Sequence, residues 1–561
     1  MAKKWTDDKI DQIRELAKTK TKKEIADIFK TSYDSIDTVS KKNGIKFSEL
    51  NNTKFKWTND KINELKDLAK TQDLTEIAVS MKLNYDTVHK ACKRYNIEFI
   101  RHKQDDDEII NRESFNINKI NKESKKRYFV TAVVAGTPLD KKAFETVKFY
   151  CKDKKAELVI LPMRGCYKKD EGYDPDVLEL SDHFVTEFTF NNNLKAKDFL
   201  LSPQQINPLT GLNRYGQKGS SLIVPSPKMQ MNVVPVSNVK MPHILHTTGV
   251  ITKPNYNHDR IGKIAYQDHL IGGLLVEIEN NEIFHLRQLQ LDDSYGMYDL
   301  GVYYQGNSKK QKHASAFIIG DWHNGFEDKS AVSCWKDCIK TVKPEYIVFH
   351  DIFDARSVSH HEENNIKAQL DRPEHLNTLE KELNCLVNML EDWCKFTDAQ
   401  LVIVKSNHDA FVDRYLSEGR YVNDRFNHRL ALDLAIEYLE GKNPLEAYCL
   451  KHSKIINKKR VRWLNYDEDF KVADFQLGSH GHLGMNGSKG TLNQMETIYG
   501  KSITGHSHTP GRLRNTIKVG TSAINLGYNA GGSSWLLNSG ILYDNSTYQS
   551  ITSIDGKYRL K

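Results

Sequence analysis

A short apolar run leads directly into two potential metal ligands in the sequence Phe317-Ile318-Ile319-Gly320-Asp321-Trp322-His323-Asn324-Gly325. A brief apolar run bounded by glycine is typical of a buried β-strand. Leucines at three- and four-residue steps over 374–396 predict a helix that packs on such a strand. In an open α/β sheet, the loops at one edge bring together residues from distant parts of the chain. We therefore expect an α/β fold whose functional groups lie at the ends of its strands.

Four further apolar runs in the C-terminal half end in the same kind of polar group, at 346–349, 401–404, 475–477 and 502–504. The polar residues that follow them are, in order, Asp351, Asn407 with His408 and Asp409, His480 with His482, and His506 with His508. Imidazole and carboxylate ligands together suit Mn²⁺, Fe or Zn²⁺, whereas Ca²⁺ prefers oxygen ligands alone. A single Asp-x-His would mean little, but five such motifs in order predict a metal site.

The order and spacing of these motifs resemble those of the calcineurin-like metallophosphoesterase family over roughly residues 313–545. This resemblance implies a β-sandwich flanked by helices and two divalent metal ions, with Mn²⁺ preferred over Mg²⁺, Fe or Zn²⁺. It implies the following ligands: Asp321, His323 and His508 for one metal, Asn407, His480 and His506 for the other, and Asp351 bridging both. A metal pair of this kind can share a hydroxide and clamp the attacking and leaving oxygens of a phosphoryl group.

Two residues next to these ligands receive catalytic roles from the same resemblance. His408 would lie beside the scissile phosphate and protonate the leaving oxygen or stabilise its charge, and Asp409 would orient His408. His482 remains an alternative to His480 as the ligand of the fourth motif.

The chain departs from the family pattern at three further positions. His350 and Ser406 replace glycines before Asp351 and Asn407, which is tolerable where the backbone needs no positive φ. Arg356 lies one residue later than the arginine of related phosphoprotein phosphatases, so it is not assigned to phosphate.

An internal repeat occupies the N-terminus, because residues 5–47 and 57–99 align without gaps and share 18 identities over 43 positions. Each copy has the pattern of three short helices and resembles Myb-like and resolvase-like helix-turn-helix modules, which predicts such domains at 1–50 and 51–104. The third helix of such modules enters the DNA major groove. The residues that could meet phosphates or base edges are Lys41, Lys42, Lys90, Lys93 and Arg94. The alternative is a pair of three-helix modules that bind protein.

The remaining sequence predicts a linker and two larger domains. Residues 105–126 form a polar linker, 127–310 a middle α/β domain without recognisable chemistry, and 311–561 the metallophosphoesterase-like domain. The middle domain begins with a strand at 128–134, a helix to about 155 and a second strand at 158–161, which predicts a parallel pair. Residues 200–310 are expected to be rich in β-structure.

Charge segregation favours DNA as the substrate of the predicted site. Residues 1–104 hold 23 Lys and Arg against 16 Asp and Glu, so they carry seven of the eight excess positive charges of the chain. The histidine set also resembles the repair-nuclease branch of the family, and the layout of the whole chain resembles early-expressed DNases with which some lytic tailed phages degrade host DNA. We therefore expect a metal-dependent endo- or exonuclease that acts on double-stranded DNA.

Two other functions remain open at this point: a DNA-tethered protein or nucleotide phosphatase, and a non-catalytic DNA-binding regulator. By analogy with repair-type relatives, a homo-oligomer is expected. The sequence has no apolar stretch of about 18 residues and no signal-like N-terminus, so we expect no membrane association. The expected location is the cytoplasm, that of the bacterial host if a phage encodes the chain.

Overall fold

The computed structural model describes residues 5–17, 22–29, 31, 33–45, 57–72, 74–81, 83, 85–97, 126–166, 172–216, 219–237, 241–363, 365–466, 468–527, 529 and 531–560. The chain divides into two compact units, 1–107 and 108–561. The part described has a mixed α/β fold with large β-sheets. None of its helices is long and apolar enough to cross a membrane.

The first unit contains two sets of three short helices. They are α1 (Asp7–Leu16), α2 (Lys22–Ile28) and α3 (Tyr33–Lys42), then α4 (Asn59–Leu68), α5 (Leu74–Ser80) and α6 (Tyr85–Tyr95). The first set buries Ile13, Ala17, Ile25, Ala26, Ile36, Val39 and Ile45. Each of these has a buried counterpart 52 positions later: Leu65, Ala69, Ile77, Ala78, Val88, Ala91 and Ile97. The sequence repeat is therefore also a repeat of the core.

The second unit begins with a parallel strand pair joined by a helix, as the sequence predicts. These elements are β1 (Arg127–Val134), α7 (Lys141–Lys154) and β2 (Glu157–Met163), and Tyr128 pairs with Glu157. The antiparallel strands β8 (Gly272–Ile278) and β9 (Phe284–Gln290) complete a four-stranded sheet in the order β2-β1-β8-β9. A three-stranded sheet of β10 (Gly296–Asp299), β11 (Val302–Gln305) and β12 (Ser308–Gln311) follows.

A six-stranded sheet positions most of the predicted ligands. Its order is β16-β15-β14-β13-β22-β23, and the first four strands are parallel. Their bounds are β13 (Ala316–Ile319), β14 (Tyr346–Phe349), β15 (Gln400–Ile403), β16 (Val461–Trp463), β22 (Asn538–Leu542) and β23 (Tyr548–Thr552).

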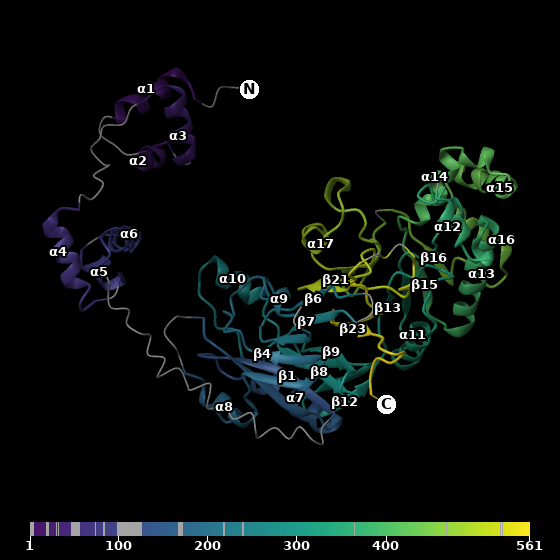
Figure 1. The fold of residues 1–561 in the computed structure, drawn as a ribbon, viewed down its shortest axis with the longest axis horizontal. Coiled ribbons are helices and arrows are strands. Elements are labelled where there is room, and N and C mark those ends of the chain that lie inside the picture. Colours follow the sequence, from purple (N-terminus) through teal and green to yellow (C-terminus); the bar gives the residue numbers. More distant parts are fainter. Residues whose placement is uncertain are drawn as a thin grey trace. The chain divides into compact units, whose positions relative to one another are not determined.

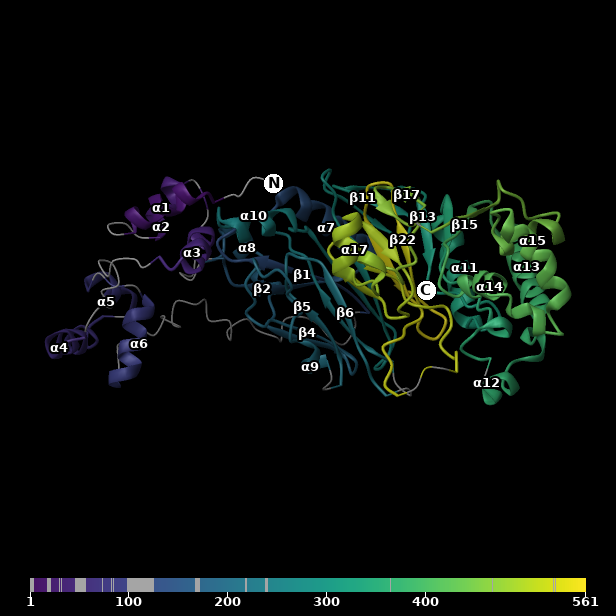
Figure 2. The same cartoon turned by 90° about the horizontal axis from the view of Figure 1, so that it is seen from above.

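Helices form a layer on one side of this sheet (Figure 1, Figure 2). They include α11 (Lys329–Val342), α13 (Leu379–Phe396), α14 (Asp409–Ser417), α15 (His428–Leu439) and α16 (Pro444–His452). The predicted leucine stripe lies in α13, where Leu383, Leu386 and Leu390 are fully buried in the core shared with the sheet. This helix is therefore part of the core, as its spacing predicts.

A ten-stranded sheet packs against the other face. Its order is β17-β18-β19-β21-β20-β6-β7-β5-β4-β3. The bounds are β17 (Lys471–Val472), β18 (Phe475–Gln476), β19 (Ser502–Thr504), β20 (Gly511–Leu513), β21 (Thr516–Lys518), β3 (Glu187–Asn191), β4 (Leu194–Lys197), β5 (Ser221–Val224), β6 (Gln230–Val234) and β7 (His243–Thr247). Ile318, Val348 and Ile503 lie in one apolar cluster between the two sheets.

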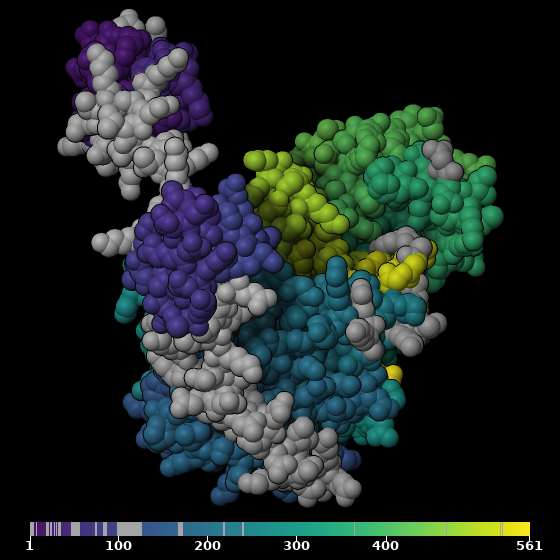
Figure 3. Space-filling view, turned by 60° about the vertical axis from the view of Figure 1, so that its left-hand side comes forward, coloured from purple at the N-terminus to yellow at the C-terminus, as the bar shows by residue number. Residues whose placement is uncertain are grey.

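The ten-stranded sheet joins the regions before and after residue 311. β20 pairs with β6 through Arg512 and Met231, so the predicted domain boundary between residues 310 and 311 does not interrupt the sheet. On the face shown in Figure 3, olive-yellow residues of the C-terminal part lie between the green helical layer and the blue-teal strands. The middle region thus shares its framework with the strands that carry the ligands.

Candidate metal centre

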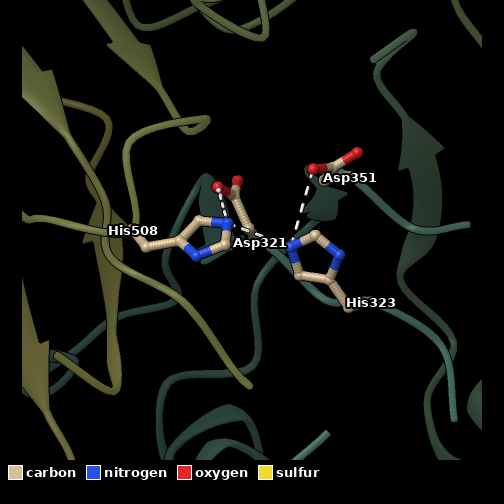
Figure 4. Close-up of side chains that lie close together, drawn as sticks. All are labelled: Asp321, His323, Asp351 and His508. Atoms are coloured by element: carbon tan, nitrogen blue, oxygen red, sulfur yellow. Dashed lines mark hydrogen bonds and ion pairs between the residues drawn. The ribbon is translucent and has the colours of Figure 1, made fainter. Parts of the chain in front are cut away.

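Four predicted ligands meet at the strand ends. Asp321 and His323 follow β13, Asp351 follows β14, and His508 lies in the loop after β19. All four side chains are buried, and their ligand atoms lie within 4.8 Å of one another. Figure 4 shows the side chains pointing toward a common centre. The structure therefore brings carboxylates and imidazoles from three segments into one cluster.

The shortest distance in this cluster joins two imidazole nitrogens. His323 Nε2 lies 3.0 Å from His508 Nε2, which in turn lies 3.2 Å from Asp321 Oδ2. His323 Nε2 also lies 3.6 Å from Asp351 Oδ2. Since the other nitrogen of His323, Nδ1, faces Asp354 at 2.9 Å, its proton belongs there and Nε2 presents a lone pair. Several lone pairs thus converge on one point, which is the arrangement that a cation requires.

Buried polar atoms without hydrogen-bond partners support the same conclusion. In the described part of the chain they include Asp321 Oδ2, Asp351 Oδ1, His508 Nδ1 and both ring nitrogens of His480. Leaving such an atom unpaired costs about 1–3 kcal/mol. Burial and the nearby Asp351 charge raise the pKa of Asp321 well above its usual range, and burial lowers the pKa of His508 well below its own. A divalent cation would offset the costs at the carboxylate oxygens and at the one ring nitrogen that each ligating histidine turns toward it, so the buried cluster could hold a metal ion.

The ligand-bearing loops also have an unusual backbone. His323, Asp351, His506 and His508 have positive φ angles of 51°, 47°, 71° and 55°. A residue other than glycine seldom adopts this conformation, and it clusters at functional sites. His350 and Ser406, which replace family glycines, do not have positive φ and so need no glycine there.

Gly505 allows the last ligand loop to approach the cluster. A Cβ atom at this position would lie 2.2 Å from Asp321 Oδ1 and 2.9 Å from the Cβ of His350. The next residue, His506, donates its backbone N–H to Asp321 Oδ1 at 3.0 Å. A side chain at 505 would therefore displace either Asp321 or the loop.

The predicted second ligand set lies beside the first. His506 Nδ1 is 3.1 Å from Asn407 Oδ1. The wholly buried His480 has Nε2 at 3.9 Å from Asp351 Oδ2 and Nδ1 at 3.9 Å from Asp321 Oδ1. His482 is half-buried, with its ring centroid 5.4 Å from that of His480. This geometry favours His480 over His482 as the residue that faces Asp351.

Asp354 is a site residue that the sequence reasoning missed. Its Oδ1 lies 2.9 Å from Nδ1 of His323 and 2.9 Å from Nδ1 of His408, so one carboxylate fixes both rings. Arg356 donates from Nε to the other oxygen of Asp354. The available signal was the second aspartate of the Asp-x-x-Asp motif that starts at Asp351.

Asp409 does not make the contact with His408 that we expected. Its Oδ2 accepts a hydrogen bond from the backbone N–H of Ser406 at 3.1 Å, which fixes the loop that carries Asn407. The orienting contact to His408 comes from Asp354 instead, because the turn after β14 brings that carboxylate within 2.9 Å of His408 Nδ1.

His408 faces the cluster without belonging to the four-residue group. Its Nε2 lies 3.8 Å from Asp351 Oδ2. Burial alone would lower the pKa of His408, but the charges of Asp351 and Asp354 outweigh burial and raise it to about 10. The two carboxylates thus favour the protonated form of the ring, whose Nε2 faces Asp351.

The predicted DNA-binding residues lie on α3 and α6 in the first unit. Lys41, Lys42, Lys90, Lys93 and Arg94 are all exposed. Lys41 forms an ion pair with Asp37 at 2.7 Å on the same helix. α6 carries three Lys or Arg residues against one Asp and is basic, whereas α3 carries two Lys and two Asp residues. The binding of either helix to DNA stays a prediction.

One relative was found among known proteins. The chain is 26% identical over 469 residues to Protein A1 of Escherichia phage T5, and the match covers 77% of this chain and 83% of that protein. This similarity supports a relationship to phage proteins. No family model matches the chain. No solved structure matches it either.

Proposed function

We propose that this chain is a metal-dependent DNase of the calcineurin-like metallophosphoesterase type. It hydrolyses phosphodiester bonds, and it serves a phage in the degradation of host DNA. The observation that carries the proposal is the buried Asp/His cluster with unpaired ligand atoms, beside which His408 Nε2 faces Asp351. The similarity to a phage protein over most of the chain supports the phage context.

Two divalent ions fit the donor set. Asp321, His323 and His508 would hold one, and Asn407, His480 and His506 the other. Asp351 would serve both, because its Oδ2 lies 3.6 Å from His323 Nε2 and 3.9 Å from His480 Nε2. Mn²⁺ suits this mixture of imidazole, amide and carboxylate ligands. When bound, such ions supply positive charge to the phosphoryl group and make water a stronger nucleophile.

The chain itself supplies the proton for the leaving group. His408 donates from Nε2 to the departing sugar oxygen, and Asp354 accepts the Nδ1 hydrogen and keeps the ring in place. Asp354 contacts His323 in the same way, so one carboxylate positions both a predicted metal ligand and the proposed proton donor, His408. General acid catalysis of this kind contributes about 10²–10⁴-fold.

The basic helix α6 and the net positive charge of residues 1–104 provide the reason to propose DNA over other phosphoesters. A duplex presents one charge per about 1.7 Å of axis, and exposed lysines and arginines bind it through this charge. Two modules in tandem can hold an enzyme on duplex of any sequence.

The test uses the purified full-length chain on linear and circular duplex DNA, with Mn²⁺, Mg²⁺ or a chelator. The expected result is cleavage with metal and none with chelator, and cleavage of linear DNA alone would identify an exonuclease. Bis(p-nitrophenyl) phosphate and p-nitrophenyl phosphate are assayed in parallel. Faster hydrolysis of the monoester, with intact DNA, would replace the proposal with a phosphatase.

A further inference from the structure

A cavity of about 610 Å³ lies next to the metal centre. Its walls are largely apolar and include Met241, Ile524, Leu526 and Trp535, with polar groups from Asn525 and Ser533. Met241 comes from the segment before β7, and the other five from the loop that precedes β22. The middle region, to which the sequence assigned no chemistry, therefore forms part of the wall.

The cavity is connected to one side of the metal cluster through Trp535. The ring centroids of Trp535 and His508 are 4.2 Å apart, at an interplanar angle of 65°. The next residue, Leu536, donates its N–H to the carbonyl of His508 at 3.2 Å. The wall of the cavity and a predicted metal ligand are thus in direct contact.

The other side of the cluster is connected through Leu526. Its carbonyl accepts a hydrogen bond from Nη2 of Arg356 at 2.6 Å. The same arginine holds Asp354, which fixes His323 and His408. A group bound in the cavity would therefore lie next to the predicted metal centre.

The chemistry of the walls suits an uncharged, flat, partly polar group. Among the described residues that line the cavity, Asp555 is the one with a charged side chain, so a phosphate would be repelled there. Trp535 offers an aromatic surface, and the side chain of Asn525 offers an amide donor and acceptor. The volume falls within the range of about 300–1,000 Å³ that is usual for small-molecule sites. Of the parts of a nucleotide, the base fits this description and the phosphate does not.

We propose that this cavity binds the base of the nucleotide next to the cleaved phosphate, with the base stacked against Trp535. The proposal rests on the proposed function and specifies its substrate. A base inside a duplex is stacked and paired, so it cannot enter a cavity without leaving the helix. The enzyme therefore acts on an unpaired nucleotide, at a frayed end, in a single strand or after the base is flipped out.

The first experiment compares small diesters that differ only in the base. The substrates are the 3′- and 5′-(p-nitrophenyl phosphate) esters of thymidine and the matching esters of the abasic sugar, with the full chain and Mn²⁺. For at least one isomer pair, wild type should show a kcat/KM at least tenfold higher with the base. Trp535→Ala should bring the ratio of kcat/KM for the nucleoside ester to that for the abasic ester close to one, and Trp535→Phe should retain most of the preference. Tyr266→Ala, at a side chain that is 63% exposed and outside the cavity wall, is the control.

Equal hydrolysis of the nucleoside and abasic esters by wild type would overturn the cavity proposal and leave the proposed function intact. An equal loss for both esters in Trp535→Ala would also overturn it, since Trp535 would then act only through His508. A second arm measures binding of thymidine monophosphate and 2-deoxyribose 5-phosphate by calorimetry. Base-dependent binding that Trp535→Ala abolishes, without hydrolysis of any diester, would support the base-binding proposal and contradict the proposed DNase activity. If the two compounds bind equally well, the proposal that the cavity binds a base is wrong, whatever the hydrolysis assays show.

Discussion

The metal centre and the N-terminal repeats hold their charged groups in opposite ways. At the strand ends, Asp321 and Asp351 are buried and have oxygens without hydrogen-bond partners. On α3 and α6, Lys42, Lys90 and Lys93 are exposed to solvent. An unpaired buried charge lowers the stability of the fold, so it is retained where a bound ligand compensates it. An exposed charge costs little stability, and the solvent and its ions screen the field that it produces. We therefore propose catalysis for the first region and attachment to DNA for the second, and we expect substitutions in the two regions to have effects of very different size.

The largest effect is expected from Asp351→Asn. Replacing the carboxylate that faces both ligand sets should lower diester hydrolysis by at least about a thousandfold, because the metals contribute several kcal/mol to the reaction. Steady-state rates on bis(p-nitrophenyl) phosphate with Mn²⁺ measure this. Asp371→Asn, at an exposed carboxylate, is the matched control. A folded Asp351→Asn protein with wild-type rates would remove the distinction between the two regions.

A smaller effect, about 10²–10³-fold, is expected from His408→Gln on DNA. The loss should shrink with a p-nitrophenyl ester, because p-nitrophenolate leaves without needing a proton. His375→Gln tests an exposed histidine in the same way. An identical loss on both substrates would show that His408 supports the site in some other way than by donating a proton.

Deletion of residues 1–104 should have its effect on DNA alone. Affinity for duplex should fall by about tenfold or more, and its dependence on salt should become shallower, because exposed Lys and Arg bind phosphate by releasing counterions. Hydrolysis of the small diester should stay within about twofold. Fluorescence anisotropy at several salt concentrations measures the first effect. Loss of small-diester hydrolysis would show that the repeats support the catalytic unit.

The smallest effect concerns the stability of chelator-treated protein. His408 has its pKa raised to about 10 in the folded chain, against an ordinary value of 6.5. The stability from this group is therefore complete below about pH 6.5 and is lost as the pH rises toward 10. Urea unfolding at pH 6 and pH 9.5 should show a larger decrease for wild type than for His408→Gln. Equal decreases would mean that the charges of Asp351 and Asp354 do not raise the pKa of His408 in the folded chain.

Local sequence patterns account for a definite part of this structure. Apolar runs that end in Asp or His predict β13, β14 and β19, because a buried strand is apolar and polar residues follow where the chain leaves the sheet. Leucines at three- and four-residue steps predict α13, because residues at this spacing lie on the one face of a helix that packs against the core. These signals lie within a few residues, so one sequence is enough to find them.

Other features depend on contacts between distant residues. The pairing of Arg512 with Met231 joins the middle region to the C-terminal strands, and no local pattern specifies which strand edges meet. The motif that starts at Asp351 includes Asp354, but the contacts of Asp354 with His323 and His408 are defined only once the turn after β14 is folded. The cavity beside Trp535 likewise requires Met241, almost three hundred positions away.

Metal binding by the full-length chain tests the central claim most directly. Calorimetric titration with Mn²⁺ should give two ions per chain for wild type, with both bound more weakly in Asp351→Asn, because this carboxylate faces both ligand sets. Asp371→Asn should bind as wild type does. Equal Mn²⁺ binding by wild type and a folded Asp351→Asn, or no binding by either, would contradict the assignment of the buried cluster as a metal centre.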